Sequence, residues 1–190
     1  MTNLRLRTLR PAQAAVGLLA AAAAAGYLTA AAAPATTAPK ACGILTSTLA
    51  ASLLKEQPRT IVSTSLVCQY GRATERASTT RSTVGLTIVP NASVAAAKTT
   101  QLRLERLAPR KAPPGMTGFS RGRIALPHGE ATYVYFRQAG GPVIGGFVFL
   151  RVGSSTAQLT PQVVASAGRA FTAADLRTVA TRLAANWRGA

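Results

Sequence analysis

Two cysteines frame the segment that most constrains how this chain can fold. Cys42 and Cys68 lie 26 positions apart and are the only cysteines in the chain. In an exported protein such a pair is most simply interpreted as one disulfide. A bridge across a loop of this length restricts the unfolded chain by about 3.5 kcal/mol. We therefore expect the fold to be built around the segment between the two cysteines.

That segment contains one helical pattern followed by one strand pattern. Thr46 is the expected N-cap, with Leu45 before it, and Pro58 is expected to end the helix. The apolar residues that repeat at helical spacing are Leu49, Ala50, Leu53 and Leu54. Alternation over residues 63–70 then predicts a strand, and the face expected to point inward carries Leu66, Cys68 and Tyr70. The disulfide would join this helix to this strand.

The first 35 residues have the layout of a secretory signal peptide. A basic stretch with Arg5, Arg7 and Arg10 precedes an alanine-rich apolar run over 14–28, and small residues follow at 33–35. We predict a signal peptide at 1–35, a short tether at 36–41 and a single exported domain at 42–190. The protein is then secreted or associated with the cell envelope. The alternative is an uncleaved N-terminal segment that anchors the protein in the membrane.

The rest of the chain predicts further strands and one internal helix. Residues 83–89 alternate cleanly, and Asn91 is the expected N-cap of a helix over 92–105. A loop rich in proline and glycine follows at 107–118. The next predicted strands are joined by short turns, which indicates an antiparallel meander, and they lie at 121–126, 131–138, 144–152 and 156–160.

The C-terminal segment predicts an amphipathic helix. Thr172 and Asp175 form a capping box. The apolar face behind it consists of Leu176, Val179, Ala180, Leu183, Ala184 and Trp187. Together these patterns predict an α+β fold: one small domain with an antiparallel sheet of about five to six strands, packed with three helices and held by one disulfide.

The chain is strongly basic. It has 22 Lys and Arg residues against five Asp and Glu residues, and the formal net charge is +17. A cluster of bases surrounds a single acid, Glu105, and consists of Arg103, Arg106, Arg110, Lys111, Arg121 and Arg123. This cluster is our candidate site for an anionic ligand, such as an anionic cell-envelope polymer or lipid headgroups. The alternative is an ordinary solvated surface of an arginine-rich chain, and nucleic acid is the least expected partner.

The sequence offers few groups for catalysis. The single histidine, His128, lies in a Pro-His-Gly turn, and no nucleophile motif accompanies it. Two cysteines and one histidine do not form a metal-binding pattern, so we expect no metal site and no cofactor. The acids beyond residue 35 are Glu56, Glu75, Glu105, Glu130 and Asp175. Their spacing indicates no catalytic pair, and we predict no catalytic residues.

The cysteine motifs also resemble a known family. Residues 42–45 read Cys-Gly-Ile-Leu and residues 68–70 read Cys-Gln-Tyr. This pattern resembles an actinobacterial family of secreted proteins and lipoproteins known as domain of unknown function 3558. The resemblance extends over about 41–188 and implies no reaction and no catalytic residues. The chain lacks the lipid-attachment box of the lipidated members.

These observations favour a non-catalytic exported domain of the cell envelope that binds or senses an unidentified ligand. One alternative is a hydrolase that acts on wall polymers through a carboxylate pair. The other is a membrane accessory protein held by its uncleaved signal.

Overall fold

A disulfide and a seven-stranded sheet organise the domain in a computed structural model. The structure describes residues 40–76, 81–165 and 169–188, which belong to one unit spanning Thr36–Ala190. The predicted signal peptide and residues 36–39 of the predicted tether lie outside these ranges. Ala41, which we predicted to end the tether, is instead the first residue of a helix. None of the helices in the described ranges is long and apolar enough to cross a membrane.

The described chain begins with two short helices, continues with three strands, one helix and four strands, and ends with a helix. The elements are α2 (Ala41–Ile44), α3 (Ser47–Leu54), β1 (Pro58–Ser63), β2 (Val67–Arg72), β3 (Thr83–Pro90), α4 (Val94–Leu107), β4 (Met116–Leu126), β5 (Gly129–Gln138), β6 (Val143–Val152), β7 (Ser155–Val164) and α5 (Ala173–Arg188). The strand order is β1-β2-β3-β7-β6-β5-β4, and every neighbouring pair is antiparallel. The predicted α+β class, the antiparallel sheet and the disulfide are confirmed.

The predicted numbers of strands and helices were too low. Within the described ranges the sheet has seven strands and the helices number four. The missed strand, β1, lies at the edge of the sheet and has no fully buried residue, so it carries no clean alternation of apolar and polar residues. The missed helix, α2, is a single turn, which is too short to show helical periodicity.

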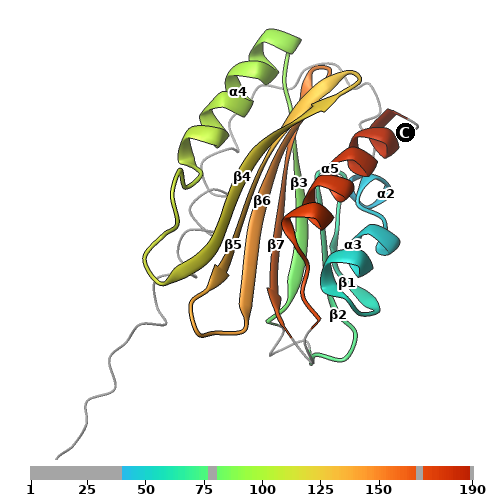
Figure 1. The fold of residues 1–190 in the computed structure, drawn as a ribbon. Coiled ribbons are helices and arrows are strands. Elements are labelled where there is room, and N and C mark those ends of the chain that lie inside the picture. Colours follow the sequence, from blue (N-terminus) through green and yellow to red (C-terminus); the bar gives the residue numbers. More distant parts are fainter. Residues whose placement is uncertain (1–39, 77–80, 166–168, 189–190) are drawn as a thin grey trace, which may run out of the picture. The chain divides into compact units, whose positions relative to one another are not determined.

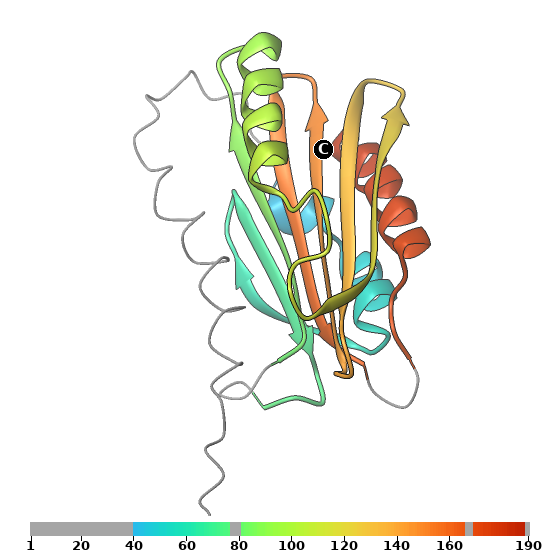
Figure 2. The ribbon, with the colours of Figure 1, turned by 60° about the vertical axis from the view of Figure 1, so that its left-hand side comes forward.

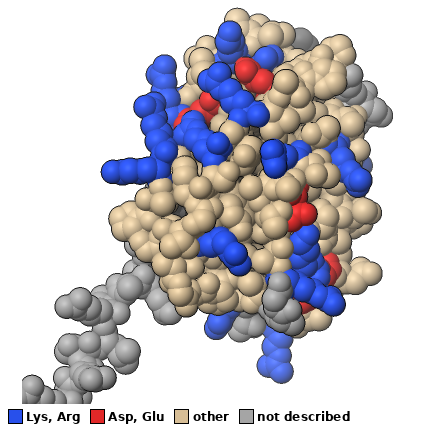
Figure 3. All heavy atoms as spheres, in the orientation of Figure 1, with Lys and Arg blue, Asp and Glu red and all other residues tan. Residues whose placement is uncertain are grey.

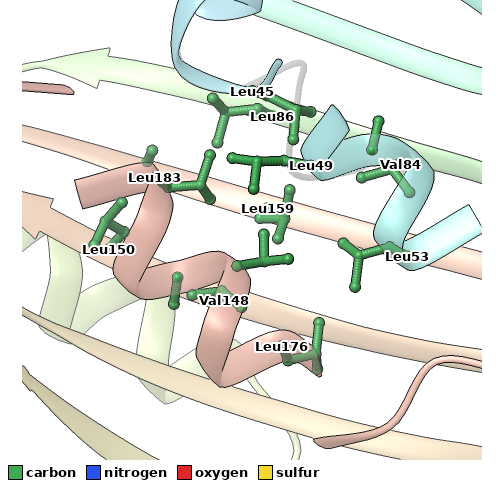
Figure 4. Close-up of a cluster of buried hydrophobic side chains, with 14 of the residues drawn as sticks. Leu45, Leu49, Leu53, Val84, Leu86, Val148, Leu150, Leu159, Leu176 and Leu183 are labelled. Atoms are coloured by element: carbon green, nitrogen blue, oxygen red, sulfur yellow. The ribbon is translucent and has the colours of Figure 1, made fainter. Parts of the chain in front are cut away.

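The two faces of the sheet are covered differently. Of the described helices, α2, α3 and α5 lie on one face and α4 lies on the other, as Figures 1 and 2 show. We call the second one the α4 face. The main core fills the space between the sheet and the three helices (Figure 4). Leu49, Leu86, Leu159 and Leu183 meet there from α3, β3, β7 and α5, and each is at most 4% exposed.

The disulfide between Cys42 and Cys68 is confirmed, but it joins different elements from those we expected. Cys42 lies in the single turn α2, and Cys68 lies fully buried in β2, with 5.0 Å between the two Cα atoms. The predicted helix, α3, lies within the closed loop instead of carrying a cysteine. The bridge therefore fixes the start of the domain to the sheet.

The helix within that loop begins as predicted, while the following strand begins later. The Thr46 hydroxyl accepts a hydrogen bond from the Leu49 amide at 3.4 Å, which confirms the N-cap. Lys55 ends α3 in the left-handed conformation, so the helix has already stopped three residues before Pro58. Our placement of Leu66 on the buried face was wrong. The chain turns around the Thr64 hydroxyl, which accepts from the amide of Val67, and Leu66 is 37% exposed.

The N-cap of α4 was also predicted wrongly. Ser93, not Asn91, caps the helix, and its hydroxyl accepts from the Ala96 amide at 3.1 Å. The Asn91 side chain instead donates to the Val89 carbonyl and accepts from the Thr100 hydroxyl. Both residue types are good caps, so the sequence did not separate them.

Helix α5 agrees with the prediction in its cap and in its buried face. The Thr172 amide donates to the Asp175 carboxylate at 2.7 Å, and the Asp175 amide donates to the Thr172 hydroxyl at 3.2 Å. All six predicted apolar positions from Leu176 to Trp187 are buried. Asp175 also forms an ion pair with Lys55 at 3.2 Å, which links the start of α5 to the end of α3.

Two acids make the stability of this fold depend on pH. Burial raises the pKa of Asp175, but hydrogen bonds from Thr172 and the charge of Lys55 outweigh it and bring the pKa below its ordinary 3.8. Burial also raises the pKa of Glu75, but hydrogen bonds from Ser82 and Arg81 and the charge of Arg72 bring it below its ordinary 4.5. A depressed pKa stabilises the fold above the unfolded-state pKa, and this stability is lost as pH falls through the folded-state pKa.

We therefore expect the free energy of unfolding to fall as pH drops below 4.5. Urea unfolding followed by circular dichroism, from about pH 7 to about pH 3, measures this dependence. The variant with both Glu75→Gln and Asp175→Asn should be less stable at neutral pH. Its free energy of unfolding should also decrease less steeply as the pH falls. If the free energy of unfolding of this variant fell as steeply with acid as that of the wild type, Glu75 and Asp175 would not be the source of the pH dependence.

Candidate functional site

A cavity opens on the α4 face, between α4 and β4. Its volume is about 220 Å³. Four arginines dominate its wall, which consists of Leu102, Glu105, Arg106, Arg110, Arg121 and Arg123. Three segments supply these residues: α4, the loop that follows it, and β4. The cavity therefore exists only because the chain folds back from α4 to the sheet.

The strand geometry turns two of the arginines toward α4. Arg121 and Arg123 are two positions apart on β4, so they share one face of the strand. They pair with Val134 and Thr132 of β5, respectively. Val134 packs with Leu104 of α4 in a second hydrophobic cluster, which shows that this face of the sheet is the one beneath the helix. Alternation in β4 thus directs both guanidinium groups into the cavity.

Arg121 also holds the end of α4 in place. Its two terminal nitrogens donate to the carbonyl of Pro109 at 3.2 Å and to the backbone carbonyl of Glu105 at 3.4 Å. The last carbonyls of a helix lack partners within the helix, so this contact satisfies one of them. Ala108, before Pro109, is extended, as is usual for a residue that precedes proline. The chain therefore leaves α4 at this point and carries Arg110 into the wall.

Glu105 is the single carboxylate in the cavity wall, and it is 8% exposed. One of its carboxylate oxygens accepts from the Gln101 amide at 3.0 Å and from the Thr132 hydroxyl at 2.8 Å. Both donors are neutral. The Gln101 side-chain oxygen, also buried, has no hydrogen-bond partner among the described residues. The carboxylate is thus stabilised by neutral groups between helix and sheet.

The arginines of the wall keep their positive charge available. None of the four forms an ion pair with a carboxylate in the described parts of the chain, where the ion pairs involve Lys55, Arg72 and Arg151. Arg106, Arg110 and Arg123 are exposed. Figure 3 shows Lys and Arg side chains gathered over α4, although others are scattered across the visible surface. The site is an open, positively charged cavity with one internal acid.

The structure brings together four of the six bases that we predicted as an anion site. Arg106, Arg110, Arg121 and Arg123 line the cavity, while Arg103 and Lys111 are exposed outside its wall. Sequence reasoning missed the contributions of Leu102 and Glu105. The spacing of Gln101 and Glu105, four positions apart on a helix, was the available signal that both polar groups face the same way.

Other polar groups have structural partners. Glu56 and Glu75 flank the buried Arg72, each at 3.8 Å, and Glu130 pairs with Arg151 at 3.5 Å. His128 lines a second cavity of about 110 Å³ together with apolar residues of β4 and α5. In the described ranges no three His, Cys, Asp or Glu residues gather in a group that could hold a metal ion. The positions of the acidic residues do not test the hydrolase alternative, which stays a prediction.

Two comparisons with known proteins give no match. No family model matches the chain, and no curated protein is found to be similar to it. The resemblance of the cysteine motifs therefore stays a prediction. The geometry and charge of the cavity are therefore the features from which a function can be inferred.

Proposed function

We propose that the protein is a non-catalytic exported domain of the cell envelope that binds an anionic group in the arginine cavity. The observation that carries this proposal is the convergence of Arg106, Arg110, Arg121 and Arg123 on one cavity. Guanidinium groups form strong paired hydrogen bonds with phosphate and carboxylate groups. The ligand is therefore an anion such as the phosphate of an envelope polymer or of a lipid headgroup.

The size of the cavity indicates how much of the ligand enters it. Pockets that enclose a drug-sized molecule are roughly 300–1,000 Å³, whereas this cavity is about 220 Å³. A single charged group fits this space better than a whole ligand does. The remainder of the ligand then lies on the surface beside α4. Binding of this kind selects for charge and for the local shape of one group.

A charge-matched pair of variants tests the proposal. Replacing Arg106, Arg110 and Arg123 with glutamine should weaken binding of polyphosphate, a soluble phosphate polymer, about tenfold, because charge-assisted hydrogen bonds are lost. Replacing the exposed Arg81, Arg169 and Arg182 removes the same charge away from the cavity. Titration calorimetry at physiological ionic strength measures the affinity of both variants for polyphosphate. Arg121 is left unchanged because it holds the end of α4.

The two variants distinguish a site from general charge. A much larger loss of polyphosphate affinity in the cavity variant supports the proposal. Equal losses of affinity in the two variants would show that only net charge matters. Glu105→Gln should change the affinity for polyphosphate in the opposite direction, because it removes a negative charge from the cavity wall. The new side chain keeps an oxygen that can accept hydrogen bonds from Gln101 and Thr132. We expect its affinity for polyphosphate to rise about threefold. Hydrolysis of wall material by the wild type, lost in this variant, would instead favour a hydrolase.

A further inference from the structure

Helix α4 carries exposed apolar side chains beside the arginine cavity. Large hydrophobic residues that are clearly exposed number five in the described parts of the chain. Three of them lie on α4: Val94 at 54%, Leu102 at 41% and Leu107 at 70%. Leu102 also forms part of the cavity wall. Apolar surface concentrated next to a charged site commonly marks an interaction surface.

The charge on the same surface is of one sign. Helix α4 and the loop after it present exposed Lys98, Arg103, Arg106, Arg110 and Lys111. The one acid in this stretch is Glu105, and it is buried against Thr132 of the sheet. The outward side of α4 therefore combines bases with leucines and presents no exposed acid. A basic helix with apolar side chains is typical of a segment that lies on an anionic membrane surface.

Helix α4 packs on the sheet with one side and turns the basic and apolar side chains outward. Among the helices of the described ranges, α2, α3 and α5 lie on the opposite face of the sheet from α4 (Figures 1 and 2). The buried residues of α4 itself are Ala97, Gln101, Leu104 and Glu105, which face the sheet. No other helix in residues 40–76, 81–165 and 169–188 covers the outward side, which suits a broad, flat partner.

We infer that the α4 face docks on a bilayer that contains anionic lipid. This inference rests on the proposed function and specifies its ligand: the phosphate of a lipid headgroup enters the arginine cavity, while Leu107 enters the interface between headgroups and acyl chains. The exposed leucines decide between lipid and soluble polymer. A soluble phosphate polymer has no apolar region for them, whereas membrane binding grows with both buried apolar area and basic charge.

Substitutions at Leu107 test the inference, with Ile61 as the matched control. Ile61 is 42% exposed and lies on β1, at the opposite edge of the sheet from β4. All variants are purified from the exported fraction of a secreting host, so that they share the same N-terminus. Leu107→Asn should weaken binding to vesicles of mixed phosphatidylcholine and phosphatidylglycerol about tenfold. Ile61→Asn should bind these vesicles as the wild type does.

A tryptophan at the same position reports insertion directly. The chain has one tryptophan, Trp187, which is buried and gives a constant background. In Leu107→Trp, tryptophan emission should shift to shorter wavelength when the vesicles are added, because the ring moves into a less polar environment. In Ile61→Trp it should not shift.

Polyphosphate binding separates this inference from the proposed function. Leu107→Asn should bind polyphosphate like the wild type. Unchanged vesicle binding in Leu107→Asn, an unshifted emission in Leu107→Trp, or equal losses for vesicles and polyphosphate would each overturn the membrane inference. A wild type that fails to bind polyphosphate would contradict the cavity function, while the Leu107 variants would still decide whether α4 docks on lipid.

Discussion

Removing the disulfide should lower the free energy of unfolding by about 3.5 kcal/mol. The bridge closes a loop with a sequence separation of 26. Its loss therefore raises the conformational entropy of the unfolded chain. The double variant Cys42→Ala and Cys68→Ala removes both sulfurs and leaves no unpaired thiol. This loss is a large part of the roughly 5–15 kcal/mol that stabilises a typical small domain. Urea unfolding followed by circular dichroism measures it.

The reduced wild type is the natural control. With a reductant present, wild type and double variant should unfold at similar urea concentrations, and without it they should differ. Because Cys68 is fully buried, Cys68→Ala also removes some packing in the core. The single variant Cys42→Ala changes a half-buried position and helps to separate the two effects. If oxidised wild type and double variant were equally stable, the bridge would not be a major stabilising feature.

Replacing Arg72 with methionine should lower the free energy of unfolding by about 3 kcal/mol. Arg72 is 4% exposed, and two of its nitrogens donate to the carbonyl of Leu54 at 3.2 and 3.1 Å. That carbonyl is at the end of α3, so the side chain attaches the helix to β2. The variant leaves a buried helix carbonyl without its partner and removes the cation between Glu56 and Glu75.

Comparison with other substitutions identifies the source of this effect. Arg81→Met removes a charge from an exposed side chain and should change stability by less than about 0.5 kcal/mol. Arg72→Lys keeps the charge but loses the planar pair of donors, so we expect an intermediate loss. Thermal melts of the three variants measure the order of their stabilities. A methionine variant as stable as the Arg81→Met control would show that the buried contacts contribute nothing.

Local sequence patterns predicted several elements closely. The strand with Val84, Leu86 and Ile88 buried and the capped helix α5 both agree with the structure. In each case the signal is complete within about ten to fifteen residues, because periodicity and capping are local properties. The strands from β4 to β7 were recognised because short turns separate them. Elements without a local signal, the exposed edge strand β1 and the single turn α2, were missed.

The candidate site could be predicted only in part. The sequence indicated a basic cluster, since its six bases fall within 21 positions. It did not show which of them converge, because Arg103 and Arg106 lie on one helix and yet only Arg106 reaches the cavity. Nor did it show that Glu105 is buried between helix and sheet. Its partner Thr132 is 27 positions away, so the contact depends on how α4 packs on the sheet.

By itself, the sequence determined the α+β class, the positions of most elements, the pairing of the only two cysteines and the excess of positive charge. These follow from composition and from patterns among near neighbours. The tertiary structure decided that Arg72 is an internal contact and that four arginines form one cavity, and it placed exposed leucines beside them. Such features depend on contacts between distant segments, and no local pattern specifies which face of the sheet a helix will cover.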